Sequence, residues 1–289
     1  MMRIKMKLFN VYLCLITLGF LAIGCSQEKK DDSFTDKMSE QHKDDKPVAN
    51  ASGNTEPSLP VESRWVNYAE LDGQAVKGYL AYPKNVSNRL PGIIVIHEWW
   101  GLNDNIEMMT RRLAGEGFEA LAVDLYGGKS ADTPEGAREL MSQSMQHRQA
   151  NIDNLRQAYQ YLVENRKVPG VGSIGWCFGG GWSLQTALAL PDKLDATVIY
   201  YGQLVTDPQE LKPLQMPILA FFGGQDPSIS QETINRFRTV LDSLGKSVDV
   251  KVYDDANHAF ANPSGTRYNE MAATDSWQRT ISFLNKELK

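Results

Sequence analysis

The sequence from Gly172 to Leu184, "GSIGWCFGGGWSL", is the most informative about the fold. A short apolar run, typical of a buried strand, leads into Cys177, and a sequence compatible with a helix follows. The pattern from Gly175 to Gly179 is G-x-C-x-G, the cysteine form of the sharp strand-to-helix turn that exposes a nucleophile. Glycines let the backbone fold tightly, and the start of a helix favours a thiolate. A buried structural cysteine is the alternative, but the turn favours chemistry.

Strand and helix patterns alternate on both sides of this turn. In chain order we expect a hairpin around Asp72-Gly73, a strand at Ile93 to Ile96, a helix from about Asn103, the strand "EALAVDLYG", a helical region Thr133 to Glu164, the strand "VGSIGW", a helix Gly180 to Leu190, the strands "ATVIYYG" and "PILAFFGG", a helix Gln231 to Leu244, the strand "VDVKVYDDA" and a last helix around Glu270 to Leu288. This order predicts an α/β fold of three layers, with helices on both faces of a mainly parallel sheet. Chemistry gathers at the carboxyl ends of such strands.

The beginning of the chain has the layout of an export signal. Three positive charges precede an almost uncharged run from Leu8 to Ile23, and Gly24 and Cys25 follow. We expect residues 1–24 to be a signal peptide. The ending "LAIGC" resembles the lipobox of bacterial lipoproteins, which implies lipidation of Cys25, anchoring to a membrane and a periplasmic or cell-surface location. A transmembrane anchor and an ordinary cleaved signal are the alternatives.

The next segment, residues 25–60, combines mixed charges with few large apolar residues. Such a composition predicts a flexible tether, in which His42 is solvated. Residues 61–289 then form the folded domain. If Cys14 leaves with the signal and Cys25 carries lipid, Cys177 has no disulfide partner within the chain. The net charge of −5 and the pI of about 5.5 argue against binding to nucleic acid.

A thiol nucleophile needs a base, and the base needs a group that orients it. Asp226 follows one apolar strand, in "FFGGQDPSIS", and His258 follows the next strand, in "YDDANHAFANPSG". The chain order Cys177, Asp226, His258 is the nucleophile, acid, histidine order of α/β-hydrolases. Singly, Asp226 could be a turn residue and His258 a loop histidine with one structural hydrogen bond. Their shared order and their positions at strand ends favour a triad.

The chain from Trp65 to Leu288 resembles the dienelactone hydrolases, also called carboxymethylenebutenolidases. The resemblance rests on "HEWWG", "DLYGG", "GWCFGG", "YYG", "GGQDP" and "NHAFANPSGTRY" in that order. It implies that Cys177 is the nucleophile, that His258 is the general base and acid, and that Asp226 orients His258. It also implies that Glu98 holds the resting thiol and releases it when substrate binds. A carboxylate in an ion pair at a strand end is the alternative for Glu98.

The same resemblance places the oxyanion hole at the backbone N–H groups of Phe178 and Trp99. Aromatic side chains around it are expected to shape an apolar substrate pocket, although they could equally belong to the core: Trp99, Trp100, Trp176 and Phe260. The sequence departs from the family at Asn262. Members of the family have an arginine at the corresponding place, which grips the carboxylate of dienelactone. Arg267 lies nearby and either replaces that arginine or is a solvated surface residue.

The remaining histidines point to no cofactor. His97 is expected to pack or to form a structural hydrogen bond, and His147 to lie on the surface. Because no histidine and carboxylate cluster has the spacing of metal ligands, we expect neither a metal nor a cofactor.

The sequence therefore predicts a monomeric hydrolase of small esters or lactones that works through an acyl thioester. Two other functions stay open. A non-catalytic lipoprotein could have kept the fold as a ligand-binding module, and a thiol peptidase could use the same residues.

Overall fold

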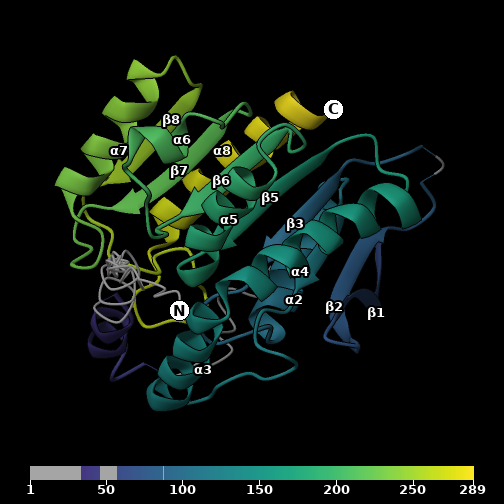
Figure 1. Cartoon of the computed structure of the whole chain (residues 1–289), viewed down its shortest axis with the longest axis horizontal. Coiled ribbons are helices and arrows are strands. Elements are labelled where there is room, and N and C mark those ends of the chain that lie inside the picture. Colours follow the sequence, from purple (N-terminus) through teal and green to yellow (C-terminus); the bar gives the residue numbers. More distant parts are fainter. Residues whose placement is uncertain (1–33, 46–56, 87) are drawn as a thin grey trace, which may run out of the picture.

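The structure is a computed structural model that describes residues 34–45, 57–86 and 88–289 (Figure 1). The predicted signal peptide, 1–24, and the predicted lipidation site, Cys25, lie outside the described residues and stay predictions. Among the described residues, no helix is both long enough and apolar enough to cross a membrane.

A single sheet of eight strands forms the centre of the domain, in the spatial order β1-β2-β4-β3-β5-β6-β7-β8. The strands β1 and β2 form the expected hairpin, β2 also pairs antiparallel with β4, and all other neighbours are parallel. Their bounds are β1 (Val61–Leu71), β2 (Gln74–Pro83), β3 (Gly92–Ile96), β4 (Glu119–Val123), β5 (Val171–Trp176), β6 (Ala196–Tyr200), β7 (Ile218–Gly223) and β8 (Val248–Tyr253).

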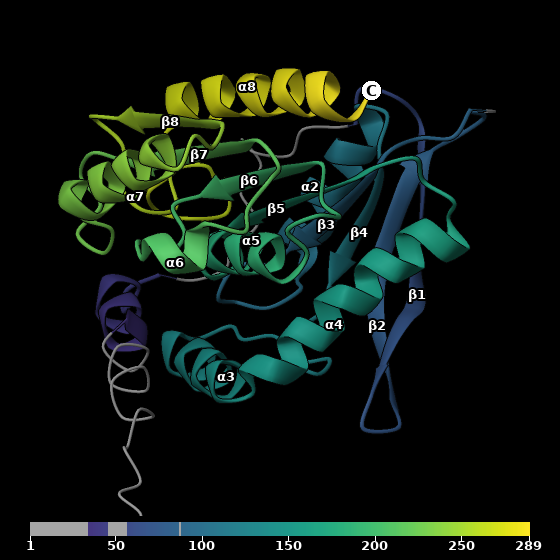
Figure 2. The same ribbon diagram turned by 45° about the horizontal axis from the view of Figure 1, so that its top comes forward.

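Helices cover both faces of this sheet, as the alternating pattern predicted (Figure 2). The helices α2 and α8 lie on one face, where the Arg112 guanidinium of α2 sits 4.0 Å from the ring centre of Trp277 in α8. The helices α4 and α5 lie on the other face. The bounds are α2 (Asp104–Gly115), α3 (Pro134–Gln146), α4 (Arg148–Gln160), the π-helical turn η2 (Tyr161–Asn165), α5 (Phe178–Ala189), α6 (Pro208–Leu211), α7 (Gln231–Ser243) and α8 (Glu270–Leu288).

The central strands are buried on both faces, which explains their continuous apolar sequences. Every residue of β3, β5, β6 and β7 is buried. Two expectations differ in detail from the structure. The helical region 133–164 is divided at His147, whose ψ of 37° ends α3 before α4 begins. The short α6 was not predicted, and its four residues are too few to show a helical period.

The expectation of a flexible tether over residues 25–60 is wrong for its part between residues 34 and 45. Residues 34–41 form a helix, drawn in purple in Figure 1, that is followed by a turn. Phe34, Met38 and His42 recur at every fourth position and are all buried. The composition of the segment does not predict this helix. A helix this short is stabilised only by its contacts with the folded domain.

Candidate active site

The turn at Cys177 has the sharp geometry that its sequence predicts. Cys177 has a φ of 57° and a ψ of −117°, a conformation that L-residues rarely adopt, and it lies between β5 and α5. A side chain at position 175 would overlap the carbonyl oxygen of Gly179, and one at position 179 would overlap the carbonyl oxygen of Ile96. Both glycines are therefore required, and the strained residue between them is the cysteine.

His258 and Asp226 form a buried pair beside this turn. Oδ2 of Asp226 lies 2.7 Å from Nδ1 of His258, and both side chains are fully buried. The other carboxylate oxygen of Asp226 accepts hydrogen bonds from the N–H groups of Ser228 at 2.7 Å and Ile229 at 3.3 Å. Asp226 therefore stabilises the turn in which it lies and also orients the ring of His258. The carboxylate fixes the tautomer that leaves Nε2 of His258 free.

The structure also brings His258 close to Cys177. One ring nitrogen of His258, one of His42 and the sulfur of Cys177 lie within 4.8 Å of one another. Burial alone raises the pKa of the Cys177 thiol, but the charge and hydrogen-bonding groups of His258 and then of His42 outweigh it and lower that pKa to about 6. Burial lowers the pKa of His258, but Asp226 and Cys177 outweigh it and raise that pKa to about 10. The two groups favour a thiolate and an imidazolium at neutral pH.

Glu98 follows β3 and is buried close to the thiol. Its carboxyl group accepts hydrogen bonds from Nδ2 of Asn262 at 2.5 Å and from Nδ2 of Asn105 at 3.3 Å. Burial, and then the negative charge of Cys177, raise its pKa to about 8, so the group is protonated at neutral pH. Glu98 has no ion pair within the described part of the chain. Asn262, which marks the departure from the family, positions this carboxyl group.

The two backbone groups expected to form the oxyanion hole lie on neighbouring elements. Phe178 is the first residue of α5, so its N–H has no acceptor within the helix. Trp99 follows β3, which pairs with β5, and it is buried. The fold thus sets both residues at the carboxyl ends of adjacent strands.

The aromatic residues predicted for the substrate pocket separate into two groups. Trp99 and Trp100 line a small cavity together with Cys177, Glu98 and Arg267. Trp176 and Phe260 do not line it. Trp176 packs on Tyr200 and lines a cavity between α2 and α8, and Phe260 packs among tyrosines, so both belong to the core. Side chains alternate along a strand, which turns Trp176 away from the thiol that follows it.

Residues 34–45 close the site, which the sequence analysis did not foresee. Sδ of Met38 lies 3.8 Å from Sγ of Cys177, and the ring centre of His42 lies 4.5 Å from that of Trp99. The cavity that remains beside the thiol has a volume of only about 10 Å³. This is about the space of one water molecule, so no larger molecule fits beside Cys177 while residues 34–45 are docked.

Arg267 is neither a solvated residue nor free to bind substrate in this closed arrangement. It contacts Asp45 Oδ2 at 2.5 Å and donates to the carbonyl oxygen of Gln41 at 2.6 Å. Asp45 also lies 2.6 Å from Nδ1 of His42 and accepts from the hydroxyl of Thr266 at 2.6 Å. The repeated spacing of residues 34, 38 and 42 was the one sequence signal for this cover.

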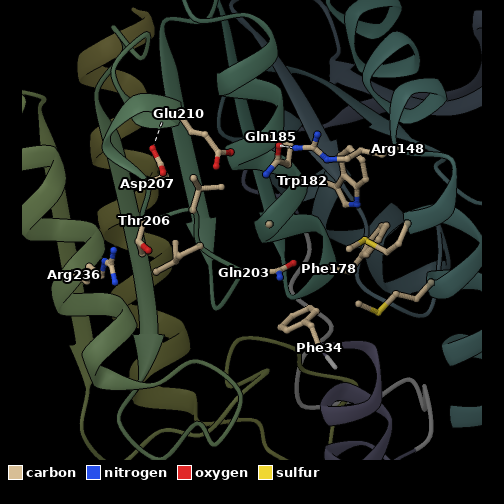
Figure 3. Close-up of a pocket in the computed structure, with 15 residues that line it drawn as sticks. Phe34, Arg148, Phe178, Trp182, Gln185, Gln203, Thr206, Asp207, Glu210 and Arg236 are labelled. Atoms are coloured by element: carbon tan, nitrogen blue, oxygen red, sulfur yellow. Dashed lines mark hydrogen bonds between the residues drawn. The ribbon is translucent and has the colours of Figure 1, made fainter. Parts of the chain in front are cut away.

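A larger cavity of about 460 Å³ lies on the other side of Phe178, between α5, α3 and the covering helix. Figure 3 shows Phe34, Phe178 and Trp182 along this cavity. The guanidinium of Arg148 donates a hydrogen bond to the side-chain oxygen of Gln185 at its edge. Cys177 does not line this cavity.

The two remaining histidines lie outside the site. His97 places Nδ1 2.6 Å from the carbonyl oxygen of Glu98 and accepts at Nε2 from the N–H of Leu125, so it is structural. His147 is exposed.

Solved structures with this architecture place the chain among the α/β-hydrolases. A structure from Klebsiella pneumoniae provisionally described as a dienelactone hydrolase aligns with a TM-score of 0.69 at 26% identity, over 77% of this chain and 97% of the other. A dienelactone-hydrolase-like promiscuous phosphotriesterase from metagenomic libraries aligns with a TM-score of 0.72 at 25% identity, over 80% and 100%. The fold class predicted from the sequence is confirmed.

The family model for the dienelactone hydrolase family matches residues 76–288, and the chain belongs to this family. Among curated relatives, Protein usf of Aquifex pyrophilus is 35% identical, over 76% of this chain and 96% of the relative. A protein of Saccharolobus solfataricus provisionally named carboxymethylenebutenolidase is 32% identical, over 77% and 98%. The predicted family and the prediction of a hydrolase are confirmed, and the family indicates ester or lactone hydrolysis.

Proposed function

We propose that the protein hydrolyses small carboxylic esters or lactones through an acyl thioester on Cys177. One observation carries this proposal: the buried Asp226 and His258 pair lies beside a cysteine that is held in a strained backbone conformation. Such a strained residue at a strand-to-helix turn is typical of an active site. The low pKa of Cys177 supports a thiolate as the attacking group.

The first half of the reaction forms the thioester. The Cys177 thiolate attacks the carbonyl carbon, and the N–H groups of Phe178 and Trp99 stabilise the oxyanion that develops. The imidazolium of His258 gives its Nε2 proton to the departing alkoxide as the carbon–oxygen bond breaks. The alcohol leaves, or stays attached if the substrate is a lactone, and His258 is now neutral.

The second half releases the acid. Neutral His258 takes a proton from water, and the resulting hydroxide attacks the thioester carbon. The carbon–sulfur bond breaks, and the thiolate and imidazolium pair is restored. Asp226 orients His258 throughout and stabilises its charged form. Protonated Glu98 adds no second negative charge next to the thiolate.

The test is hydrolysis of a short-chain nitrophenyl ester by the full chain, reduced and in detergent. We expect turnover in the wild type and none above background in Cys177→Ala, and we expect the mass of the acyl group on the wild type after rapid quenching. Equal turnover in both proteins would refute the thiol mechanism. Cleavage of peptides without cleavage of esters would support a thiol peptidase, and binding without any cleavage would support a ligand-binding module.

We also propose that the chain is exported and anchored through a lipid on Cys25. The charged start, the apolar run and the "LAIGC" ending support this proposal. Labelling of growing bacteria with a radioactive fatty acid is expected to mark the wild-type protein and to miss Cys25→Ser. Label on both proteins would place the lipid elsewhere, and label on neither would exclude a lipoprotein.

A further inference from the structure

Two histidines from opposite ends of the chain face the same thiol. His42 comes from the covering segment and His258 follows β8, and their ring centres lie 5.6 Å apart. Sγ of Cys177 completes a group of three atoms that lie within 4.8 Å of one another. The residues His42 and His258 are 2% and 0% exposed, so bulk water does not reach them.

Both imidazoles present the same unsatisfied atom to this centre. Nδ1 of His258 is bound to Asp226, and Nδ1 of His42 lies 2.6 Å from a carboxylate oxygen of Asp45. Nε2 of each ring is buried and makes no hydrogen bond of ordinary geometry, and both rings interact with the thiol of Cys177. Two poorly satisfied buried nitrogens beside one sulfur are costly, so a ligand that binds all three atoms would be favoured.

We propose that His42, Cys177 and His258 form a binding site for a thiophilic divalent cation of the Zn²⁺ type. Two imidazoles and a thiolate are a ligand set that zinc favours, and a carboxylate behind each imidazole is the usual outer partner of a zinc-bound histidine. In a tetrahedral site the ligand atoms lie about 3.3–3.8 Å apart, so side-chain shifts of about 1 Å close the group on the ion.

Charge and space at the centre also suit such an ion. A thiolate at Cys177 and the carboxylates of Asp45 and Asp226 together carry three negative charges. Once the ion has displaced the Nε2 proton of the His258 imidazolium, only the positive charge of Arg267 opposes them. A divalent cation neutralises the remainder. The cavity of about 10 Å³ next to Cys177 and His42 provides room for one water as the fourth ligand. When the ion binds, the Nε2 proton of the His258 imidazolium passes to the buffer, and so does the thiol proton if Cys177 still carries it.

The ion would join the covering segment to the nucleophile. Because His42 is a ligand only when residues 34–45 are docked, metal binding stabilises the closed arrangement. It also occupies the thiolate and Nε2 of His258, so the bound form does not hydrolyse esters. This inhibition rests on the proposed function, whereas the metal site itself does not.

The test is a titration of the reduced full chain in detergent with Co²⁺, which takes the same ligands as Zn²⁺ and absorbs light. We expect one Co²⁺ for each chain, with a thiolate-to-cobalt charge-transfer band and the visible bands of a four-coordinate ion. His42→Ala is expected to weaken binding at least about 100-fold, while His147→Ala, the same change at an exposed histidine, leaves it unchanged.

A second pair of variants tests the outer carboxylate without removing a ligand. Asp45→Asn is expected to weaken Co²⁺ binding by about 10- to 100-fold. Its neighbour Asp44 is exposed, so Asp44→Asn is the matched control and binds as the wild type does. Absence of the charge-transfer band in wild-type protein with a titratable thiol would overturn the proposal. Equal affinities of wild type and His42→Ala would overturn it too.

Zn²⁺ is then added to the ester assay. We expect inhibition that a chelator reverses and that needs at least about 100-fold more Zn²⁺ in His42→Ala. The cobalt bands are read without any ester, so a protein that binds Co²⁺ but hydrolyses nothing refutes only the proposed function. A protein that hydrolyses esters but binds no Co²⁺ refutes only the metal site.

Discussion

The turn that carries Cys177 is held by backbone packing, whereas residues 34–45, which cover the thiol, are held by side-chain contacts. At the turn, Gly175 and Gly179 lie so close to neighbouring carbonyl groups that no side chain fits. The cover docks through Met38, His42 and Asp45, and its described residues, 34–45, belong to no strand of the sheet. The first region is rigid and determines the position of the Cys177 thiol. The second can leave without disturbing the sheet, and so it can control access.

The largest effect is expected from a side chain added inside the turn. In Gly179→Ala, the new Cβ overlaps the carbonyl oxygens of Ile96 and His97, so the backbone must shift. We expect a loss of about 3 kcal/mol in the free energy of unfolding, measured by urea denaturation, and loss of ester hydrolysis.

Gly181→Ala in the same helix is the matched control. Its Cβ would lie no closer than 3.3 Å to the backbone nitrogen of Gln203, and alanine favours helices. We expect a stability within about 1 kcal/mol of the wild type. Equal stability losses in the two variants would show that the turn is not specially constrained.

The second effect concerns the pH dependence of kcat/KM. Activity needs the thiolate, so it rises as the pH passes about 6, the pKa of Cys177. It needs protonated Glu98 as well, because an ionised carboxylate opposes the negative charge of the transition state, so activity falls above about 8. Glu98→Gln cannot ionise and is expected to shift this fall toward about 10, where His258 loses its proton.

A pH–rate profile of both proteins measures these limits. The amide oxygen of the new glutamine can still accept the hydrogen bond from Asn262, so the pocket is kept. An alkaline limit that is the same in Glu98→Gln and in the wild type would rule out Glu98 as its source.

The smallest effect is expected from a substitution in the cover, residues 34–45, and concerns the accessibility of the Cys177 thiol. Met38 is fully buried against Cys177, so Met38→Ala removes part of the surface that docks residues 34–45. A loss of about 2 kcal/mol from the closed state would raise the rate at which a thiol reagent labels Cys177 by at least about 10-fold. The stability of the domain should stay unchanged.

Met271→Ala provides the control for that experiment, because Met271 is 80% exposed and lies on α8. Its labelling rate is expected to equal that of the wild type. Equal rates for Met38→Ala and the wild type would mean that the cover does not limit access to the thiol.

Local patterns in the sequence predict the sheet, the turn at Cys177 and the chain order of Cys177, Asp226 and His258. Each of these leaves a local signal, because a buried strand needs a continuous apolar run and a sharp turn needs glycines. Parallel strands then bring their carboxyl ends together, so residues that follow different strands meet.

The side chains that surround the thiol cannot be predicted from such local patterns, because they depend on how distant segments pack. Trp176 turns toward the core because side chains alternate along β5, and Asn262 binds Glu98 across 164 residues of sequence. His42 lies beside Cys177 because its short helix docks on a surface that exists only after the domain has folded. Such a helix is marginal alone, and its few apolar residues give no signal in the composition. Its place depends on contacts between distant parts of the chain.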